Sequence, residues 1–267
     1  MPLPALIATD LDGTLLRRDG TVSARTLAAL RRARDRGAEI VVVTARPPRY
    51  VDALADATGL TGLAVCSNGA IVYDLRTRTV RDSRVLAPEV ARRVAGELDA
   101  VLPGIAFAVE SGHQVWCEPS FTLRFAADGG AEVELPGRDE LWLRDAPIVK
   151  LLAWSARLDA DTMHAAAAAA VPGLAEVTHS GGTGLLEISA PGVTKAGTLA
   201  ALCAAAGIAP AQVLAFGDMP NDLTILRWAG ASYAVANAHP AVLAAVAAHT
   251  AGNEEDGVAV VLEEIYG

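Results

Sequence analysis

Short apolar segments that alternate with helix-like stretches constrain the fold of this chain more than any other feature. The clearest apolar runs occupy residues 5–8, 40–43, 63–66 and 213–216. A strand that is apolar at every position is buried on both faces, as in a parallel sheet. Helix signals separate the first three runs: Ser23 as an N-cap, Pro47-Pro48 at a helix start and Gly59 near a helix end. This order predicts a doubly wound, mostly parallel α/β sheet.

The middle of the chain has a different pattern. The spacing predicts a helix, a hairpin, a strand, a second helix and a second hairpin, at residues 89–102, 105–118, 147–154, 159–170 and 175–189. The alternating pattern then resumes with a helix capped by Thr194 and a strand at 232–235. We therefore expect a discontinuous Rossmann-like core, residues 1–82 and 188–267, with an inserted α+β cap domain at residues 83–187.

Composition excludes several classes of partner. The 267 residues are 52% apolar and carry a formal net charge of −9, which argues against nucleic acid or an anionic membrane surface as the main partner. The three cysteines are widely spaced and form no C-x-x-C pair, which favours a reduced, cytoplasmic setting. No signal peptide and no membrane span are expected. The oligomeric state expected is a monomer or a small homo-oligomer.

Polar residues gather where the predicted buried strands end. They are Asp10 and Asp12 after the first run, Thr44 after the second, Ser67 and Asn68 after the third, and Asp218, Asn221 and Asp222 after the fourth. The carboxyl ends of parallel strands share one edge of a sheet, and ligands bind in the crevice outside that edge. The four stretches are therefore predicted to converge on one site.

The residue types at this edge suit a magnesium ion and a phosphate. Clustered carboxylates repel one another, and a divalent cation with oxygen ligands removes that problem. Lys195 is placed at a helix start, where the helix dipole disfavours a cation, so it needs an anionic partner. The hydroxyl of Thr44 and the backbone N–H groups of Ala45 and Arg46 are donors of the kind that phosphates bind.

Four ordered motifs resemble those of the haloacid dehalogenase-like hydrolase superfamily. They are Asp10-Leu-Asp-Gly-Thr, Thr44-Ala-Arg, Lys195, and Gly217-Asp-Met-Pro-Asn-Asp222. Ser67-Asn68-Gly69-Ala70, Ala236-Asn237-Ala238 and Asn253-Glu-Glu-Asp-Gly257 look like the Cof-type phosphatase branch, which carries a class IIB cap. That branch inserts a mixed α+β cap between the third core strand and the lysine motif.

The resemblance implies a role for each motif residue. Asp10 would attack phosphorus and form an aspartyl-phosphate, and Asp12 would act as general acid and then as general base. Magnesium would be held by Asp10, Asp12 through its carbonyl, Asp218 and, directly or through water, Asp222. Thr44, Lys195 and Asn221 would bind the phosphoryl oxygens, as would the backbone donors at Ala45 and Arg46.

The predicted function is thus Mg2+-dependent hydrolysis of small phosphomonoesters through an aspartyl-phosphate. Sugar phosphates are the leading substrates by family resemblance, followed by nucleotides and phosphorylated pyridoxal. One alternative is a phosphomutase with the same intermediate. Another is a phospho-acceptor signalling domain, although such a domain needs no leaving-group acid.

Some residues have two readings from sequence. Arg46 can contact ligand or form a surface ion pair, and Asn68 can face the site or stabilise its own turn. Lys150 lies in an apolar strand and is expected to pair with a carboxylate. For four residues of the insertion a structural role is favoured over substrate contact: His113, Trp116, Arg124 and His179.

Overall fold

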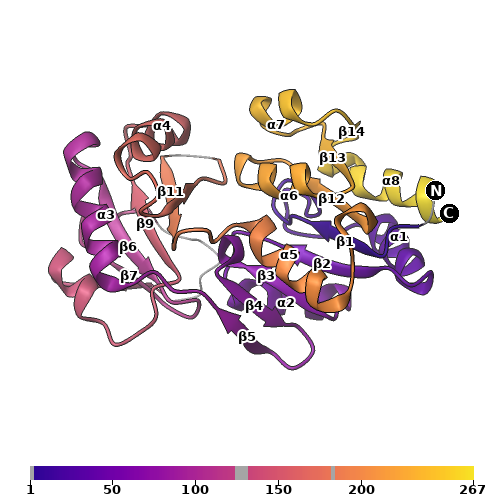
Figure 1. Cartoon of the computed structure of the whole chain (residues 1–267), viewed down its shortest axis with the longest axis horizontal. Coiled ribbons are helices and arrows are strands. Elements are labelled where there is room, and N and C mark those ends of the chain that lie inside the picture. The colour runs from indigo at the N-terminus through magenta and orange to yellow at the C-terminus, as the bar shows by residue number, and fades with distance from the viewer. Residues whose placement is uncertain (1–2, 124–131, 182–183) are drawn as a thin grey trace.

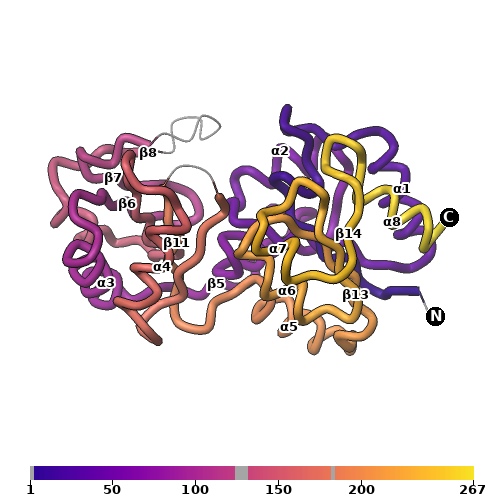
Figure 2. Tube along the Cα trace, turned by 90° about the horizontal axis from the view of Figure 1, so that it is seen from above, coloured from indigo at the N-terminus to yellow at the C-terminus, as the bar shows by residue number. Residues whose placement is uncertain are grey.

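The computed structural model describes residues 3–123, 132–181 and 184–267. These residues form two β-sheets that lie side by side in two perpendicular views (Figures 1 and 2). The chain builds most of the first sheet, crosses to the second after β5 and returns before α5 (Figure 1). We call the two sheets the core sheet and the insertion sheet.

The core sheet has eight strands. Their order is β14 (His249–Thr250), β13 (Ala231–Val235), β12 (Val213–Gly217), β1 (Leu6–Thr9), β2 (Glu39–Val43), β3 (Leu63–Cys66), β4 (Ile71–Asp74) and β5 (Thr79–Ser83). The six strands from β14 to β3 are parallel, and β3, β4 and β5 pair antiparallel. The predicted mostly parallel sheet is confirmed, whereas no pattern above predicts the hairpin β4–β5 or the two-residue β14.

Helices cover both faces of the core sheet. They are α1 (Ala24–Asp35), α2 (Pro48–Thr58) and α8 (Gly257–Tyr266) on one face, and α5 (Lys195–Ala206), α6 (Leu223–Trp228) and α7 (Pro240–Ala245) on the other. Successive residues of β1 enter opposite layers, since Ile7 packs with α1 and α8 while Leu6 and Ala8 pack with α5 and α6. Leu6, Ile7 and Ala8 must therefore all be apolar, as the sequence pattern indicates.

Two predicted helix caps are present in the structure. The Ser23 hydroxyl accepts from the N–H of Thr26 at 3.0 Å, and the Thr194 hydroxyl accepts from the N–H of Gly197 at 3.0 Å. Each satisfies a backbone donor that the first turn of a helix leaves unpaired. The Thr194 cap fixes the start of α5, and so the position of Lys195, its first residue.

The insertion sheet has six strands. Their order is β10 (Glu176–Thr178), β11 (Leu185–Ser189), β9 (Lys150–Trp154), β6 (Ala106–Glu110), β7 (Val115–Cys117) and β8 (Glu132–Glu134). The two predicted hairpins, β6–β7 and β10–β11, are both antiparallel. Helices α3 (Pro88–Val101) and α4 (Ala160–Ala170) pack on one face of this sheet. Leu98 of α3 and Met163 of α4 belong to one hydrophobic cluster with Phe107 of β6. The α/β core with an α+β insertion matches the predicted fold class, while the domain boundaries at 82/83 and 187/188 remain a prediction.

Two general features complete the fold. Among the described residues, no helix combines the length and apolar character needed to cross a bilayer. Cys66, Cys117 and Cys203 are all unoxidised and buried, so they serve as small core side chains.

Candidate active site

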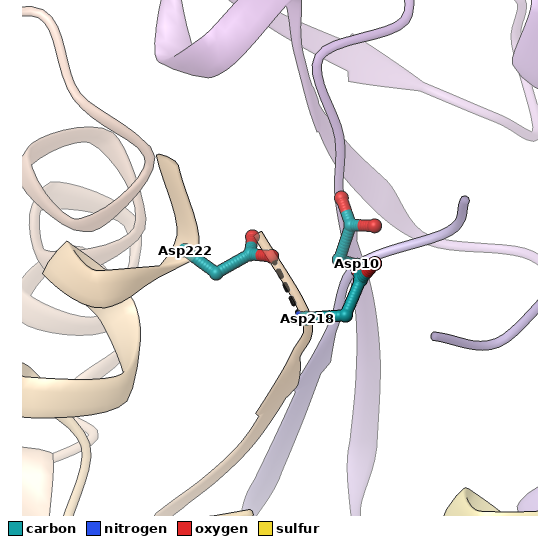
Figure 3. A group of neighbouring side chains, drawn as sticks. All are labelled: Asp10, Asp218 and Asp222. Atoms are coloured by element: carbon teal, nitrogen blue, oxygen red, sulfur yellow. Dashed lines mark hydrogen bonds between the residues drawn. The ribbon is translucent and has the colours of Figure 1, made fainter. Parts of the chain in front are cut away.

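Three aspartates meet at the ends of two neighbouring core strands. β1 and β12 pair in parallel, and the N–H of Asp10 donates to the carbonyl of Phe216 at 3.1 Å, so Asp10 and Asp218 leave the sheet side by side. Asp222 comes back to the same point from the short 3-10 turn η4 (Pro220–Asp222). Carboxylate oxygens of the three residues lie within 4.8 Å of one another (Figure 3). The predicted convergence of the first and fourth stretches therefore holds for these side chains.

Lys195 joins two of these aspartates. Its Nζ donates to Asp10 Oδ1 at 2.6 Å and to Asp222 Oδ1 at 2.7 Å, and the lysine is only 1% exposed. Burial alone lowers the pKa of Lys195, but the two carboxylates outweigh it and raise the pKa above its ordinary value. The lysine is thus a permanent cation whose anionic partners, predicted from its place at a helix start, are protein side chains.

Asp222 is completely engaged by the protein. Besides Lys195, its second oxygen Oδ2 accepts from the N–H groups of Asp218 and Met219, each at 3.0 Å, and the residue is fully buried. These bonds fix the turn that follows β12. Gly217 is required beside it, because a Cβ there would lie 2.5 Å from the Cβ of Asp222.

Asp218 is held by the first motif. Thr14 donates its hydroxyl to Asp218 Oδ1 at 2.7 Å, and Gly13 has a φ of +76° and leaves room for Asp218 Oδ2, with which a Cβ at this position would collide. Burial and the charge of Asp222 raise the pKa of Asp218 to about 7. Burial also raises the pKa of Asp10 well above its usual range, with Lys195 opposing the shift and Asp222 and Asp218 adding to it. When the three carboxylates are ionised, the single positive charge of Lys195 therefore does not balance the negative charge of the site.

The donor set suits a hard divalent cation. Three carboxylates against one ammonium leave two negative charges at the cluster of Asp10, Asp218 and Asp222. Asp10 Oδ2 and Asp218 Oδ2 are the oxygens that no hydrogen bond described here engages. Magnesium prefers such oxygen ligands and keeps several waters. Because both oxygens of Asp222 are engaged elsewhere, Asp222 fits the role of supporting the ligands better than that of direct ligand.

Asp12 lies apart from this cluster. Its side chain is 52% exposed and is gripped by Arg46, which donates from Nε to Oδ2 at 2.6 Å and from Nη2 to Oδ1 at 2.5 Å. The Arg46 guanidinium also lies over the ring of Tyr50, 5.3 Å from its centroid. Both readings of Arg46 thus have a basis, because its ion pair is formed with a predicted catalytic residue.

Thr44 is buried at the end of β2. Its hydroxyl oxygen accepts from the N–H of Arg46 at 3.0 Å, and its own carbonyl accepts from the N–H of Asn68. One of the predicted phosphate donors, the Arg46 N–H, is therefore engaged locally. The hydroxyl proton of Thr44 is still available to an acceptor.

A cavity of about 450 Å³ lies between the core and the insertion. Of the predicted site residues it is lined by Asp10, Asp12, Ala45, Arg46 and Asn221. The insertion contributes Glu110, Lys150, Leu152, Ser180, Leu185 and Glu187, and the core adds Pro47, Arg49, Tyr50 and Met219. Thr44, Lys195, Asp218 and Asp222 are buried and are not among its lining residues. The insertion therefore closes over the crevice at the strand ends, where it can exclude water.

Asn68 connects the insertion to the site. It has a left-handed backbone, with φ 56°, so it does shape its own turn. Its side chain also donates to Glu187 Oε2 at 2.7 Å and accepts from Asn221 Nδ2 at 3.0 Å. In the described part of the chain Asn221 Oδ1 is buried without a hydrogen-bond partner, which leaves this oxygen available to a ligand group.

Three of the insertion residues considered from sequence, His113, Trp116 and His179, do not line the cavity. His113 is exposed, Trp116 packs with the core of the insertion, and His179 is buried beside Asp161, 3.3 Å from its Oδ1. The structural readings favoured for these three residues agree with this placement. Arg124 lies outside the described residues.

For three residues of the cavity wall no functional role is predicted from the sequence: Glu110, Lys150 and Glu187. Lys150 pairs with both glutamates, as expected for a lysine in an apolar strand. One feature of the sequence could have identified them: each charged residue lies within or at the end of an otherwise apolar strand, as in Ala-Phe-Ala-Val-Glu of β6. Which core residues face them depends on tertiary packing.

Comparisons with known proteins agree over nearly the whole chain. The sequence model described as haloacid dehalogenase-like hydrolase matches residues 7–262. The 5-amino-6-(5-phospho-D-ribitylamino)uracil phosphatase YitU of Bacillus subtilis is 28% identical, with 98% of each chain covered. A phosphoglycolate phosphatase of Halorubrum lacusprofundi is also 28% identical, with 97% of this chain and 96% of that protein covered.

A solved structure shares the fold. It is described as a sugar phosphatase of haloacid dehalogenase subclass IIB and is 19% identical, with a TM-score of 0.79. The match covers 97% of this chain and 98% of that one. The core and the insertion therefore both have counterparts in that structure.

Proposed function

The chain belongs to the haloacid dehalogenase-like hydrolases, and from this we propose that it is a Mg2+-dependent phosphatase acting on small phosphomonoesters, sugar phosphates first, through an aspartyl-phosphate. The membership predicted from the four motifs is confirmed, as is the expectation of an enzyme in this superfamily. The metal, the intermediate and the substrate class are the proposal.

One observation carries the proposal. A buried lysine holds one oxygen of Asp10, at 2.6 Å from Lys195 Nζ, while Asp10 also lines the cavity. A carboxylate that is oriented by a fixed cation and faces a cavity is arranged as a nucleophile. No structural need explains three buried carboxylates around a single ammonium, since burying charge costs stability unless it is compensated.

The first chemical step is transfer of the phosphoryl group to the protein. Asp10 Oδ2 attacks phosphorus, and the bond from phosphorus to the leaving alcohol oxygen breaks. Once its pair with Arg46 is released, Asp12 takes up a proton from solvent and gives it to this oxygen. The partly exposed pair is worth only about 0–1 kcal/mol, so an arriving phosphate can take over the Arg46 guanidinium.

The second step returns the protein to its starting state. Asp12, now a carboxylate, takes a proton from a water molecule that attacks phosphorus. The bond between phosphorus and Asp10 breaks, and inorganic phosphate leaves. Lys195, the hydroxyl of Thr44 and the second N–H of Asn221 Nδ2 stabilise the negative charge that spreads over the phosphoryl oxygens.

The proposed metal would be held by Asp218, the carbonyl of Asp12 and the Asp10 oxygen that does not attack phosphorus, with Asp222 supporting them. When bound, Mg2+ neutralises phosphoryl charge and orients the phosphate for in-line attack. The two excess negative charges of the cluster and the raised pKa of Asp218 support a site built for a divalent cation.

The proposed partner is a small phosphorylated metabolite. A cavity of about 450 Å³ has the size of small-molecule sites. The phosphatases reported above are named for small phosphorylated compounds. A cytoplasmic location is part of the same proposal and is supported by three unoxidised cysteines.

A phosphate-release assay tests the proposal. The purified protein would be incubated with p-nitrophenyl phosphate, sugar phosphates and nucleotides, with MgCl2 or with EDTA. We expect inorganic phosphate release that needs Mg2+, and loss of that release in Asp10→Asn while circular dichroism shows an intact fold. Retention of full activity by Asp10→Asn would refute the mechanism. Formation of an isomer without phosphate release would instead identify a phosphomutase.

A further inference from the structure

Three charged residues share one face of the insertion sheet, on the side of the cavity. Glu110 ends β6 and stands opposite Lys150 at the start of β9, and Glu187 of β11 stands opposite Leu152. Lys150 and Leu152 are two residues apart in a strand and so point to the same face. All four line the cavity, and the three charged residues are at most 6% exposed.

Lys150 uses all its donors within the protein. Its Nζ donates to the carbonyl of Ala45 at 2.9 Å and lies 3.2 Å from Glu110 Oε2 and 3.3 Å from Glu187 Oε1. An ammonium has three N–H donors, so no donor remains for a ligand. Lys150 therefore positions the two glutamates and ties them to the segment that follows Thr44.

The two glutamates differ in whether the protein supplies hydrogen-bond donors to both of their carboxylate oxygens. Both carboxylate oxygens of Glu187 are engaged by the protein, because Oε1 accepts from Lys150 and Oε2 accepts from Asn68. Glu110 Oε1 is buried, forms an ion pair with Arg49 Nη1 at 3.5 Å and has no hydrogen-bond partner among the described residues. Buried polar atoms are nearly always hydrogen-bonded. A carboxylate oxygen in a cavity wall that has an ion pair but no hydrogen bond indicates a donor that arrives with the ligand.

We infer that Glu110 is a specificity-determining residue that accepts a hydrogen bond from a hydroxyl group on the leaving alcohol. The inference rests on the proposed phosphatase function and narrows its substrates to phosphomonoesters of polyhydroxy compounds. Glu110, Glu187, Lys150 and Arg49 sum to zero charge, so this end of the cavity does not attract a second anionic group. A hydroxyl donor satisfies Glu110 Oε1 without adding charge.

The test compares two esters that differ only in hydroxyl groups. Glycerol 3-phosphate and propyl phosphate have the same carbon chain, and kcat/KM would be measured for both with Mg2+. We expect the wild-type protein to prefer glycerol 3-phosphate at least tenfold. In Glu110→Gln this preference should fall about tenfold, because a neutral amide is a weaker acceptor than a carboxylate. Thermal unfolding would verify that the variant is folded.

Glu187→Gln is the matched control. Both oxygens of Glu187 are engaged by the protein, so this variant should lower kcat/KM for the two esters alike and leave their ratio within about twofold. An equal effect of Glu110→Gln on both esters, or an equal shift of the ratio in Glu187→Gln, would overturn the inference.

The wild-type measurement needs no variant and separates the two proposals. No preference for glycerol 3-phosphate, or hydrolysis of p-nitrophenyl phosphate without hydrolysis of either ester, would overturn the role of Glu110 and leave the phosphatase proposal standing. No phosphate release from any of the three compounds would overturn both.

Discussion

Lys195 Nζ lies 2.6 Å from Asp10 Oδ1, and neither residue is more than 5% exposed. A helix of the second half of the chain thereby orients a carboxylate at the end of the first strand. The bond leaves Asp10 Oδ2 for the proposed attack on phosphorus, and it offsets part of the repulsion among the three aspartates.

Replacement of Lys195 tests this relationship. In Lys195→Met the aspartates lose their ammonium, and we expect the metal-free protein to lose about 3–5 kcal/mol of unfolding free energy. Phosphate release should fall at least about 100-fold. Urea unfolding and steady-state assays measure the two effects. The double variant Lys195→Met, Asp222→Asn removes one negative charge and should recover stability but not activity; recovery of activity would contradict the proposed role.

The stability of the metal-free protein should fall as pH rises. The pKa of Asp218 is about 7 in the folded chain, against about 3.9 in an unfolded one. The folded state therefore binds this proton more tightly, and the resulting stability, complete below about pH 3.9, disappears as pH rises through 7. For Asp218 alone the loss between pH 5 and 7 is about 2 kcal/mol.

Urea unfolding in EDTA at pH 5, 6 and 7 measures this loss. Saturating Mg2+ should abolish it, because the ion stabilises the ionised carboxylates. The loss should also be smaller in Asp218→Asn. An unfolding free energy that increases with pH in EDTA would argue against the raised pKa.

Arg46 is predicted to exchange Asp12 for the substrate phosphate. Its ion pair with Asp12 is partly exposed, so Arg46→Met should change the unfolding free energy by no more than about 1 kcal/mol. KM should rise about tenfold, with kcat within about threefold of wild type, because the main loss is a charged contact to the phosphate. Steady-state kinetics with Arg46→Lys as the partial replacement provide the measurement. A fall in kcat at unchanged KM would instead indicate that Arg46 acts on Asp12 during turnover.

Gly217 is predicted to be essential for the turn after β12. A Cβ in Gly217→Ala would lie 2.5 Å from the Cβ of Asp222, so the buried turn must shift, at a cost of about 1–3 kcal/mol. Activity should fall as well, because Asp222 positions both Lys195 and the backbone of Asp218.

Gly96→Ala is the control for this change. Gly96 lies within α3, where an added Cβ meets no atom within 4 Å. Helix propensity should raise the stability of Gly96→Ala by about 0.5–1 kcal/mol. Urea unfolding of the two variants compares a steric effect with a purely conformational one, and equal stability changes would contradict the predicted clash.

The sequence by itself determined the core fold and the residues that meet in the acidic cluster. Apolar runs at β1, β2, β3 and β12 require burial on both faces, and the residue after each strand must then reach one edge of the sheet. This reasoning brings Asp10 and Asp218 together from local pattern alone, and the position of Lys195 at a helix start adds the expectation of an anionic partner. It did not anticipate the β4–β5 hairpin. β4 carries the apolar run Ile71-Val72-Tyr73, but β5 is exposed at every position and so lacks the pattern of a buried strand.

Only the tertiary structure decided which contacts each of those side chains makes. The engagement of both Asp222 oxygens and the grip of Arg46 on Asp12 depend on distances between segments far apart in the chain. The same holds for the cavity wall of Glu110, Lys150 and Glu187, where the register of β6, β9 and β11 sets the partners. Strand alternation predicts the face on which a side chain lies, whereas the opposing residue is set by how the insertion packs on the core.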